Sequence, residues 1–268
     1  MKSEYDFVKY LEKIKISHKN VVHGIGDDCA VLRFNNKNYV VTTDTSLLGP
    51  HFTKDYTPEE IGHKSLATNL SDIAAMGCVP LYALYAITLP KMSGSWIKRF
   101  FKGTKKLLQE YNVSIIGGDT TRGPLSISIT LIGVQKHQVL LRSGAKKDHE
   151  IFVTGTIGNA RAALVLNNRT EGHKYFRKFL VKPTPRVSVG LELSKFASSC
   201  IDISDGLAKD LKNIAISSKR GFELNMDLLP VDPKFNHFIK PELREICMIG
   251  GGEDYELCFT SNKKYTNK

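Results

Sequence analysis

Apolar and polar positions along the chain follow two different periods, which predict helices in some segments and strands in others. Apolar residues recur with helical spacing in residues 1–15, 57–77 and 93–112. Runs of strand type, rich in Ile, Tyr, Thr and Ser, occupy residues 81–90 and 126–134. Helical and strand segments alternate over much of the length, so the pattern predicts an α/β protein.

The best-defined helix is predicted after Thr57. Thr57 suits the N-cap and Pro58 the first helical position, and Glu60 stands three residues after Thr57, as a capping box requires. Gly77 can take the left-handed conformation that ends a helix, and Pro80 prevents its continuation. The sequence therefore predicts both ends of this helix.

This helix has a polar stripe beside its apolar one. Ser65, Asn69 and Asp72 are spaced at i, i+4 and i+7, so they share a face. Read alone, the stripe is most simply the solvent side of a half-exposed helix. The alternative is that the stripe is a functional face. The distribution of the other polar residues helps to choose between the two interpretations.

Carboxylates recur at the ends of predicted strands and helices, beside glycine or small polar residues. They are Asp27, Asp28, Asp44, Asp72, Asp119, Asp202, Asp205 and Glu253. Any one of them fits an ordinary turn. Together they would repel one another unless cations compensated. Mg²⁺ prefers oxygen ligands and uses a few carboxylates together with substrate phosphates. The pattern therefore favours a multi-Mg²⁺ nucleotide site, with hydroxyls of Thr42, Thr43 and Ser204 as further ligands or phosphate contacts.

The pattern also predicts several strands and one loop. Two short strands should flank residues 24–28, a strand should run from Tyr39 to Thr43, and a buried strand should precede Gly117. Residues 167–175 read as a loop and 221–230 as a strand.

A polar seam at about residues 140–150 predicts two domains, 1–140 and 141–268. After the seam, Gly155 and Gly158 allow either a helix N-terminus that approaches a phosphate or a plain tight turn.

Composition narrows the class of protein. The chain has 268 residues, 41% hydrophobic and 24% charged, as in soluble globular proteins. No apolar run approaches the roughly 18 residues of a membrane span, and the N-terminus has no signal-peptide core. The cysteines form no CxxC pair, which argues against zinc and suits a reducing cytoplasm; they are Cys29, Cys78, Cys200, Cys247 and Cys258.

The net charge of +11 does not indicate nucleic-acid binding, because the lysines are dispersed and form no arginine-rich run. We interpret them as a solvated surface that would also attract phosphorylated substrates. The common ATP-binding signatures are absent as well. There is no GxxxxGK[ST] loop and no protein-kinase motif set, and GIGDDC fails the dinucleotide pattern at its last glycine.

Eight segments, in order and with consistent spacing, resemble one known family. They are GIGDDCAVL, TTDTSLLGPHF, NLSDIAAMG, GGDTTRGPLSI, RSGAK, VTGTIG, IDISDGL and GGEDYELCF. Together they are similar to the thiamine-monophosphate kinases, which belong to the aminoimidazole-ribonucleotide-synthetase-like ATP-binding superfamily. The resemblance covers residues from about 20 to 260. It implies a two-domain α/β fold, with a mixed N-terminal sheet and helices followed by a C-terminal α/β domain.

The resemblance also implies a reaction and a set of roles. ATP and thiamine monophosphate would give ADP and thiamine diphosphate in the cytoplasm, in a homodimer whose N-terminal sheets pair. Mg²⁺ ions around the ATP phosphates would be held by Asp28, Thr42, Thr43, Asp44, Asp72, Asp119, Asp202 and Asp205. Asp72, Asp119 and Asp205 would be catalytic. Gly118, Arg142 and Ser204 would contact ATP, Tyr111 its base, and His51 and Glu253 the thiamine phosphate.

Members of this family continue for several tens of residues after the segment that matches GGEDYELCF, so we expect this chain to lack final elements of the second domain and an aromatic contact to thiamine. Two alternatives stay open. One is another ATP-using synthetase of the superfamily, and the other is a truncated, non-catalytic nucleotide-binding copy. The acceptor phosphate is already anionic, so the kinase reaction predicts no general base and no phosphoenzyme.

Overall fold

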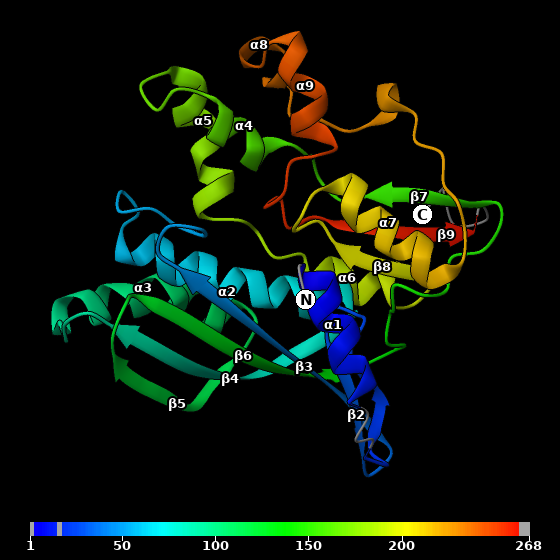
Figure 1. Ribbon diagram of the computed structural model, residues 1–268, viewed down its shortest axis with the longest axis horizontal. Helices are drawn as coiled ribbons and strands as arrows, with labels where there is room; N and C mark the ends of the chain where they lie inside the picture. The colour runs from blue at the N-terminus through cyan, green and yellow to red at the C-terminus, as the bar shows by residue number, and fades with distance from the viewer. Residues whose placement is uncertain (1–2, 15–17, 263–268) are drawn as a thin grey trace.

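The computed structural model describes residues 3–14 and 18–262 and contains two β-sheets flanked by helices (Figure 1). The first sheet has the spatial order β1-β2-β3-β6-β4-β5. The β4 and β5 strands run parallel, and the other neighbouring strands run antiparallel. The strands are β1 (Val21–His23), β2 (Ala30–Phe34), β3 (Lys37–Leu47), β4 (Cys78–Leu89), β5 (Ser114–Arg122) and β6 (Ser126–Gln135).

The helices α2 (Pro58–Ala75) and α3 (Gly94–Glu110) lie side by side on one face of this sheet (Figure 1). The predicted capping box of α2 is confirmed: Thr57 Oγ1 accepts a hydrogen bond from Glu60 N, and the Glu60 carboxylate accepts one from Thr57 N. Gly77 has φ of 63°, as a helix-ending glycine should.

The simplest interpretation of the polar stripe on α2 was wrong. Ser65 and Asn69 are as buried as the apolar Leu66 and Leu70. The helix has neighbours on several sides, because α6 and β8 from the second half of the chain pack on it in addition to the sheet and α3. A polar stripe that looks solvent-facing in the sequence is therefore turned toward the junction of the two halves.

The second sheet has the order β7-β9-β8 and is antiparallel. Its strands are β7 (His149–Val153), β8 (Ser199–Asp202) and β9 (Leu257–Asn262). The α7 helix (Leu207–Ser218) packs on it, and a separate helical group shares a core around Phe176 and Phe235. The remaining helices are α1 (Glu4–Lys13), α4 (Asn159–Val165), α5 (Glu171–Val181), α6 (Val187–Leu193), α8 (Phe235–Phe238) and α9 (Pro241–Met248).

The largest core crosses from the first half into the second. Val187, Cys200 and Leu257 belong to the same buried cluster as the first sheet and α2. The α6 helix approaches α2 so closely that a Cβ on Gly190 would lie 2.1 Å from the carbonyl oxygen of Ala74. The division into domains 1–140 and 141–268 stays a prediction, with the first sheet ending before it and the second beginning after it.

Several sequence-based elements need correction. The β3 strand runs beyond the predicted 39–43 in both directions, because it pairs with β2 and β6. The segment 114–122 is an exposed edge strand and not a buried one, since β4 is its only paired strand among the described residues. Residues 221–230 form no strand and contain a single 3₁₀ turn, η1 (Met226–Leu228), and the predicted loop 167–175 contains the start of α5, capped by Thr170.

The opening helix is confirmed as α1, and the predicted positions 1–2 and 15 lie outside the described residues. Within the described part of the chain, no helix combines the length and the apolar character that crossing a membrane would require.

Candidate active site

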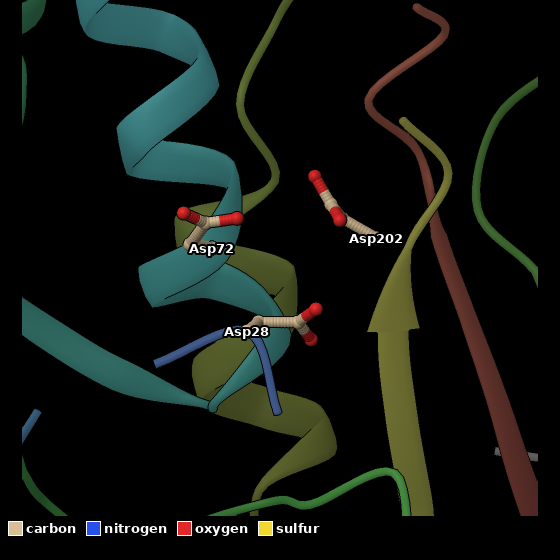
Figure 2. A group of neighbouring side chains, drawn as sticks. All are labelled: Asp28, Asp72 and Asp202. Atoms are coloured by element: carbon tan, nitrogen blue, oxygen red, sulfur yellow. The ribbon is translucent and has the colours of Figure 1, made fainter. Parts of the chain in front are cut away.

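Three aspartates from distant parts of the sequence converge where the two halves of the chain meet. Asp28 lies in the loop between β1 and β2, Asp72 in α2, and Asp202 at the end of β8. One carboxylate oxygen from each lies within 4.8 Å of the others. Figure 2 shows the three side chains around a common space. The structure therefore brings together three of the predicted metal ligands; we call them the acidic cluster.

Hydroxyl groups orient two of these carboxylates. Thr42 Oγ1 donates a hydrogen bond of 2.5 Å to Asp72 Oδ2, and Ser71 Oγ donates one of 2.7 Å to Asp202 Oδ2. Ser71 and Asp72 are neighbours on α2, so this helix supplies one ligand and orients another. Thr42 was predicted from the sequence, whereas Ser71 was missed because nothing in the sequence reveals its contact across the junction.

Asp28 is held by Arg142, which was predicted to contact ATP. Arg142 Nη2 and Nε donate to Asp28 Oδ1 at 2.5 and 3.3 Å, and the Arg142 backbone N donates to the carboxylate of Asp27. The side chain of Asp28 is only 2% exposed, yet its Oδ2 is buried without a hydrogen-bond partner among the described residues. A buried carboxylate oxygen that has no protein hydrogen-bond donor is suited to contact a bound ligand or ion.

Burial and mutual repulsion raise the pKa values of the acidic cluster. Burial raises the pKa of Asp72 well above its usual value, and the charges of Asp44, Asp202 and Asp28 raise it further. Burial raises the pKa of Asp28 to about 6, although Arg142 opposes the shift. Burial also raises the pKa of Asp202, with Asp28 adding to the effect. Such carboxylates are ionised at neutral pH most readily when a cation compensates them.

Asp44 lies close enough to interact with the acidic cluster electrostatically. Its backbone N donates to Asn69 Oδ1 at 3.2 Å, which attaches β3 to the buried polar stripe of α2. Burial raises the pKa of Asp44, while a hydrogen bond from Thr68 and the nearby His51 lower it. The helix α2 thus contacts Asp44 of β3 and Asp202 of β8 as well as supplying Asp72.

The oxygen donors and charge of the acidic cluster fit Mg²⁺. All three groups are carboxylates, the ligand class that this hard cation prefers. One oxygen of Asp28 has no hydrogen-bond partner within residues 3–14 and 18–262, and the three charges repel one another. A bound cation would give the Asp28 oxygen a partner and would offset the repulsion among the three carboxylates.

Other predicted ligands are not in the acidic cluster within one chain. Successive strand residues face opposite sides of a sheet. Thr42 faces α2, whereas the Thr43 hydroxyl lies 2.8 Å from that of Thr130 on the other face. Asp205 is half-exposed and forms an ion pair with Lys209 at 2.6 Å. The metal-binding roles of Thr43 and Asp205 stay predictions that their side-chain positions do not support.

Asp119 is separated from Asp44 by three strand spacings of the first sheet. The register from β3 through β6 and β4 to β5 aligns Asp44, Ile129, Tyr85 and Gly118 in one row. Three strand spacings correspond to about 14 Å. Asp119 is exposed on the edge strand and accepts a hydrogen bond of 2.9 Å from Thr121 Oγ1. The metal-binding and catalytic role of Asp119 also stays a prediction. Within one chain, Asp119 is too far from the acidic cluster to play that role there.

The residues predicted to contact ATP are dispersed. A Cβ on Gly118 would lie 1.8 Å from the carbonyl oxygen of Tyr85, so the close approach of β5 to β4 requires glycine there. The carbonyl oxygen of Ser204 accepts a hydrogen bond from Glu253 N at 2.8 Å. The Tyr111 hydroxyl donates to the carbonyl oxygen of Pro185 at 3.1 Å. Of this set, Arg142 directly contacts the acidic cluster.

The two predicted acceptor residues are joined by a lysine that the sequence analysis missed. Lys64 Nζ donates to the carbonyl oxygen of His51 at 2.9 Å and forms an ion pair with the carboxylate of Glu253. The His51 Nδ1 accepts a hydrogen bond from Leu47 N at 3.1 Å. The available signal was the spacing on α2, because Lys64, Thr68 and Asp72 follow one another at four-residue intervals on one face.

The turn before α4 is not a phosphate site. The carboxylate of Asp254 accepts hydrogen bonds from Gly158 N at 2.6 Å and Ala160 N at 3.1 Å. A protein carboxylate therefore takes the position that an anion would need. The tight-turn alternative is the one that the structure supports.

A cavity of about 910 Å³ lies away from the acidic cluster, beside β7 and α7. Its lining includes apolar side chains such as Phe152, Leu211 and Phe222. None of the predicted site residues is among the described residues that line it. Volume alone therefore does not identify the reactive part of this molecule.

Comparison with known proteins identifies the family. Residues 26–135 match the family described as "AIR synthase related protein, N-terminal domain". The thiamine-monophosphate kinase of Buchnera aphidicola (from Acyrthosiphon pisum) is 39% identical, over 99% of this chain and 85% of that protein. The corresponding kinase of Escherichia coli K12 is 41% identical, over 94% of this chain and 80% of that protein.

The chain belongs to the thiamine-monophosphate kinase family. A solved structure described as "AaThiL complexed with AMPPCP and TMP" superposes with a TM-score of 0.88 at 29% identity, over 97% of this chain and 85% of that one. The family and the α/β fold of the aminoimidazole-ribonucleotide-synthetase type, both predicted from the sequence, are confirmed.

Proposed function

We propose that this chain transfers the terminal phosphoryl group of ATP to thiamine monophosphate, giving ADP and thiamine diphosphate. The observation that carries the proposal is the convergence of Asp28, Asp72 and Asp202 at the junction of the two halves. Family membership supports it, as does the AaThiL structure, which holds a non-hydrolysable ATP analogue together with thiamine monophosphate.

The reaction is a direct displacement at phosphorus. An oxygen of the acceptor phosphate forms a bond to the γ-phosphorus, while the bond to the bridging oxygen breaks and ADP leaves with that electron pair. The attacking oxygen is already anionic, so no proton has to be removed from it. Such reactions depend on positioning and on charge stabilisation more than on covalent or acid–base chemistry.

The chain's own residues provide that positioning. The acidic cluster would hold Mg²⁺, which when bound would neutralise charge on the phosphates. Thr42 and Ser71 fix the orientation of Asp72 and Asp202 through their hydroxyls. Arg142 brings a permanent positive charge to the same place, where it pairs with Asp28 and would attract an ATP phosphate.

The enzyme acts, in this proposal, as a homodimer in the cytoplasm. The β5 strand is exposed along its whole length, including Ile115 and Ile116, and an uncovered edge of this kind invites pairing. A second copy paired along this edge would cover Asp119, which is exposed in the single chain. All five cysteines are free thiols, which suits a reducing compartment.

The test is an assay for thiamine diphosphate formed from ATP, Mg²⁺ and thiamine monophosphate by the purified chain. Product that depends on all three supports the proposal. ADP release with an aminoimidazole acceptor and not with thiamine monophosphate would point to another reaction of the superfamily. Calorimetric binding of ATP with Mg²⁺ and no turnover with any acceptor would mean a non-catalytic nucleotide-binding protein.

A further inference from the structure

Lys64 is a buried cation in the middle of α2, with a side chain that is 5% exposed. Its ammonium group contacts the loop that precedes α2 and a segment from the second half of the chain. One contact is the carbonyl oxygen of His51, at 2.9 Å, in the loop after β3. The other is the carboxylate of Glu253, 189 residues away in the second half. Burying an ammonium group is costly unless it is paired, so these contacts define its place in the fold.

The segment that carries Glu253 is held in an unusual conformation. Glu253 has φ of 71° and Tyr255 has φ of 52°, values that non-glycine residues rarely adopt. Their backbone N–H groups donate to the carbonyl oxygens of Ser204 and Ile203. Such a backbone persists only when surrounding contacts hold it. The ion pair with Lys64 is the contact that ties Glu253 to α2.

Lys64 is also aligned with the acidic cluster. Lys64, Thr68 and Asp72 lie on one face of α2 at four-residue intervals, and eight residues of helix span about 12 Å. Thr68 lies between them and donates its hydroxyl to the carbonyl oxygen of Ser65 at 3.1 Å. A single rigid helix thus relates the place where Mg²⁺ and ATP would bind to the place where His51 and Glu253 meet.

We propose that Lys64 is the positioning residue of the acceptor subsite. Its ammonium group holds the His51 loop and the Glu253 carboxylate, which come from different halves of the chain, at one fixed place for the thiamine phosphate. The inference rests on the proposed function, because His51 and Glu253 are acceptor residues only in that reaction. Loss of the ammonium group should weaken acceptor binding and leave the ATP site intact.

Steady-state kinetics of Lys64→Met, Lys64→Arg and the control Lys105→Met test this. Lys105 is an exposed lysine of α3, so the control removes the same charge from the surface. For Lys64→Met we expect the KM for thiamine monophosphate to rise about tenfold or more and the KM for ATP to stay within about twofold. Lys64→Arg should recover most of the loss. An unchanged acceptor KM, or equal changes in both KM values, would overturn the proposal.

Glu253→Gln provides a second route, even where Lys64→Met fails to fold, because it removes the ion pair and keeps the lysine. It too should raise the acceptor KM, and Glu253→Gln with Lys64→Gln should be no worse than the worse of the two single variants. Multiplying effects of the two changes would overturn the proposal.

The wild-type chain separates this inference from the proposed function. If it makes no thiamine diphosphate, the proposed reaction fails. Calorimetric titration of thiamine monophosphate into wild type and Lys64→Met then still tests the subsite: weaker binding to the variant supports the inference, and equal binding or none to either protein overturns it.

Discussion

The acidic cluster and the pair Asp119 and Asp205 look alike in the sequence and differ in the structure. In both sets the aspartates stand at or near the ends of strands or helices, beside glycine or small polar residues. The cluster residues are buried, repel one another and have raised pKa values. Asp119 is exposed on an edge strand, and Asp205 is half-exposed beside Lys209. The two sets differ in whether each aspartate lies at the junction of the two halves or on the surface.

This contrast matters because charge has different consequences in the two surroundings. In the cluster, burial weakens screening by water, so the carboxylates take up protons more readily or need a cation to stay ionised. At the surface the same groups are stable without one, and a pair such as Asp205 with Lys209 contributes little. The structure therefore predicts that a single chain holds Mg²⁺ at the cluster, and that exposed aspartates act only where another molecule buries them.

Removing one charge from the cluster should give the largest effect. Asp72→Asn should lower kcat by about 10²–10³-fold, the usual cost of losing a preorganised electrostatic contact. Asp227→Asn, an exposed change in the 3₁₀ turn, is the matched control and should have near-normal kcat. Circular dichroism should show both variants folded. Near-normal turnover of Asp72→Asn would remove this residue from the site.

A variant of Asp119 tests the difference between the acidic cluster and the exposed aspartates most strictly. If each site of a dimer takes Asp119 from the other copy, Asp119→Asn should be nearly inactive, and mixing it with Asp72→Asn should restore activity. In a mixed dimer, one site would have both residues intact, so an equal mixture should recover about a quarter of wild-type activity. Mixing after reversible dissociation and assaying thiamine diphosphate measures this. No recovery would mean that Asp119 acts within its own chain or not at all.

Stability should depend on pH in a way that reports the cluster. The pKa of Asp28 is about 6 in the folded chain against an ordinary 3.8. Between these values the folded state holds a proton that the unfolded state has released, so the free energy of unfolding falls as pH rises from about 4 to 6.

Thermal unfolding at a series of pH values without Mg²⁺ measures this fall in the free energy of unfolding. In Asp72→Asn the fall should be smaller than in the wild type. Mg²⁺ should restore wild-type stability more at pH 7.5 than at pH 5, because it binds the deprotonated carboxylates. An identical pH dependence in both proteins would contradict the mutual repulsion described here.

The smallest effect is expected at Asp205. Its ion pair with Lys209 is solvated, so Asp205→Asn should change the melting temperature by no more than about 1–2 °C. We also expect its kcat to fall by less than about tenfold, well short of Asp72→Asn. Parallel kinetics of the two variants decide this. An equally large loss would place Asp205 with the cluster in the reacting state.

Local signals were enough to predict some of this fold and part of its site. The caps of α2 follow from Thr57, Glu60 and Gly77, because capping depends on near neighbours in the sequence. The acidic turns were also visible. The burial of Ser65 and the contacts of Lys64 were not, since both depend on α2 lying between two halves.

The same limit explains the errors in strand assignment. The apolar run of β5 suggested a buried strand, yet burial depends on neighbours, and β5 has one. Residues 221–230 alternate like a strand but pair with no strand in the described part of the chain, and they are irregular apart from a short 3₁₀ turn. Thr42 and Thr43 looked equivalent in sequence, and only the direction of β3 relative to α2 distinguishes them.

The central claim is that the acidic cluster is the metal and phosphate site. A crystal of the chain grown with Mn²⁺ and a non-hydrolysable ATP analogue tests it most directly, because anomalous scattering locates the manganese. We predict an anomalous peak among the carboxylates of Asp28, Asp72 and Asp202, in contact with phosphate oxygens of the analogue. Bound analogue with manganese only elsewhere, and none among these three residues, would contradict the claim.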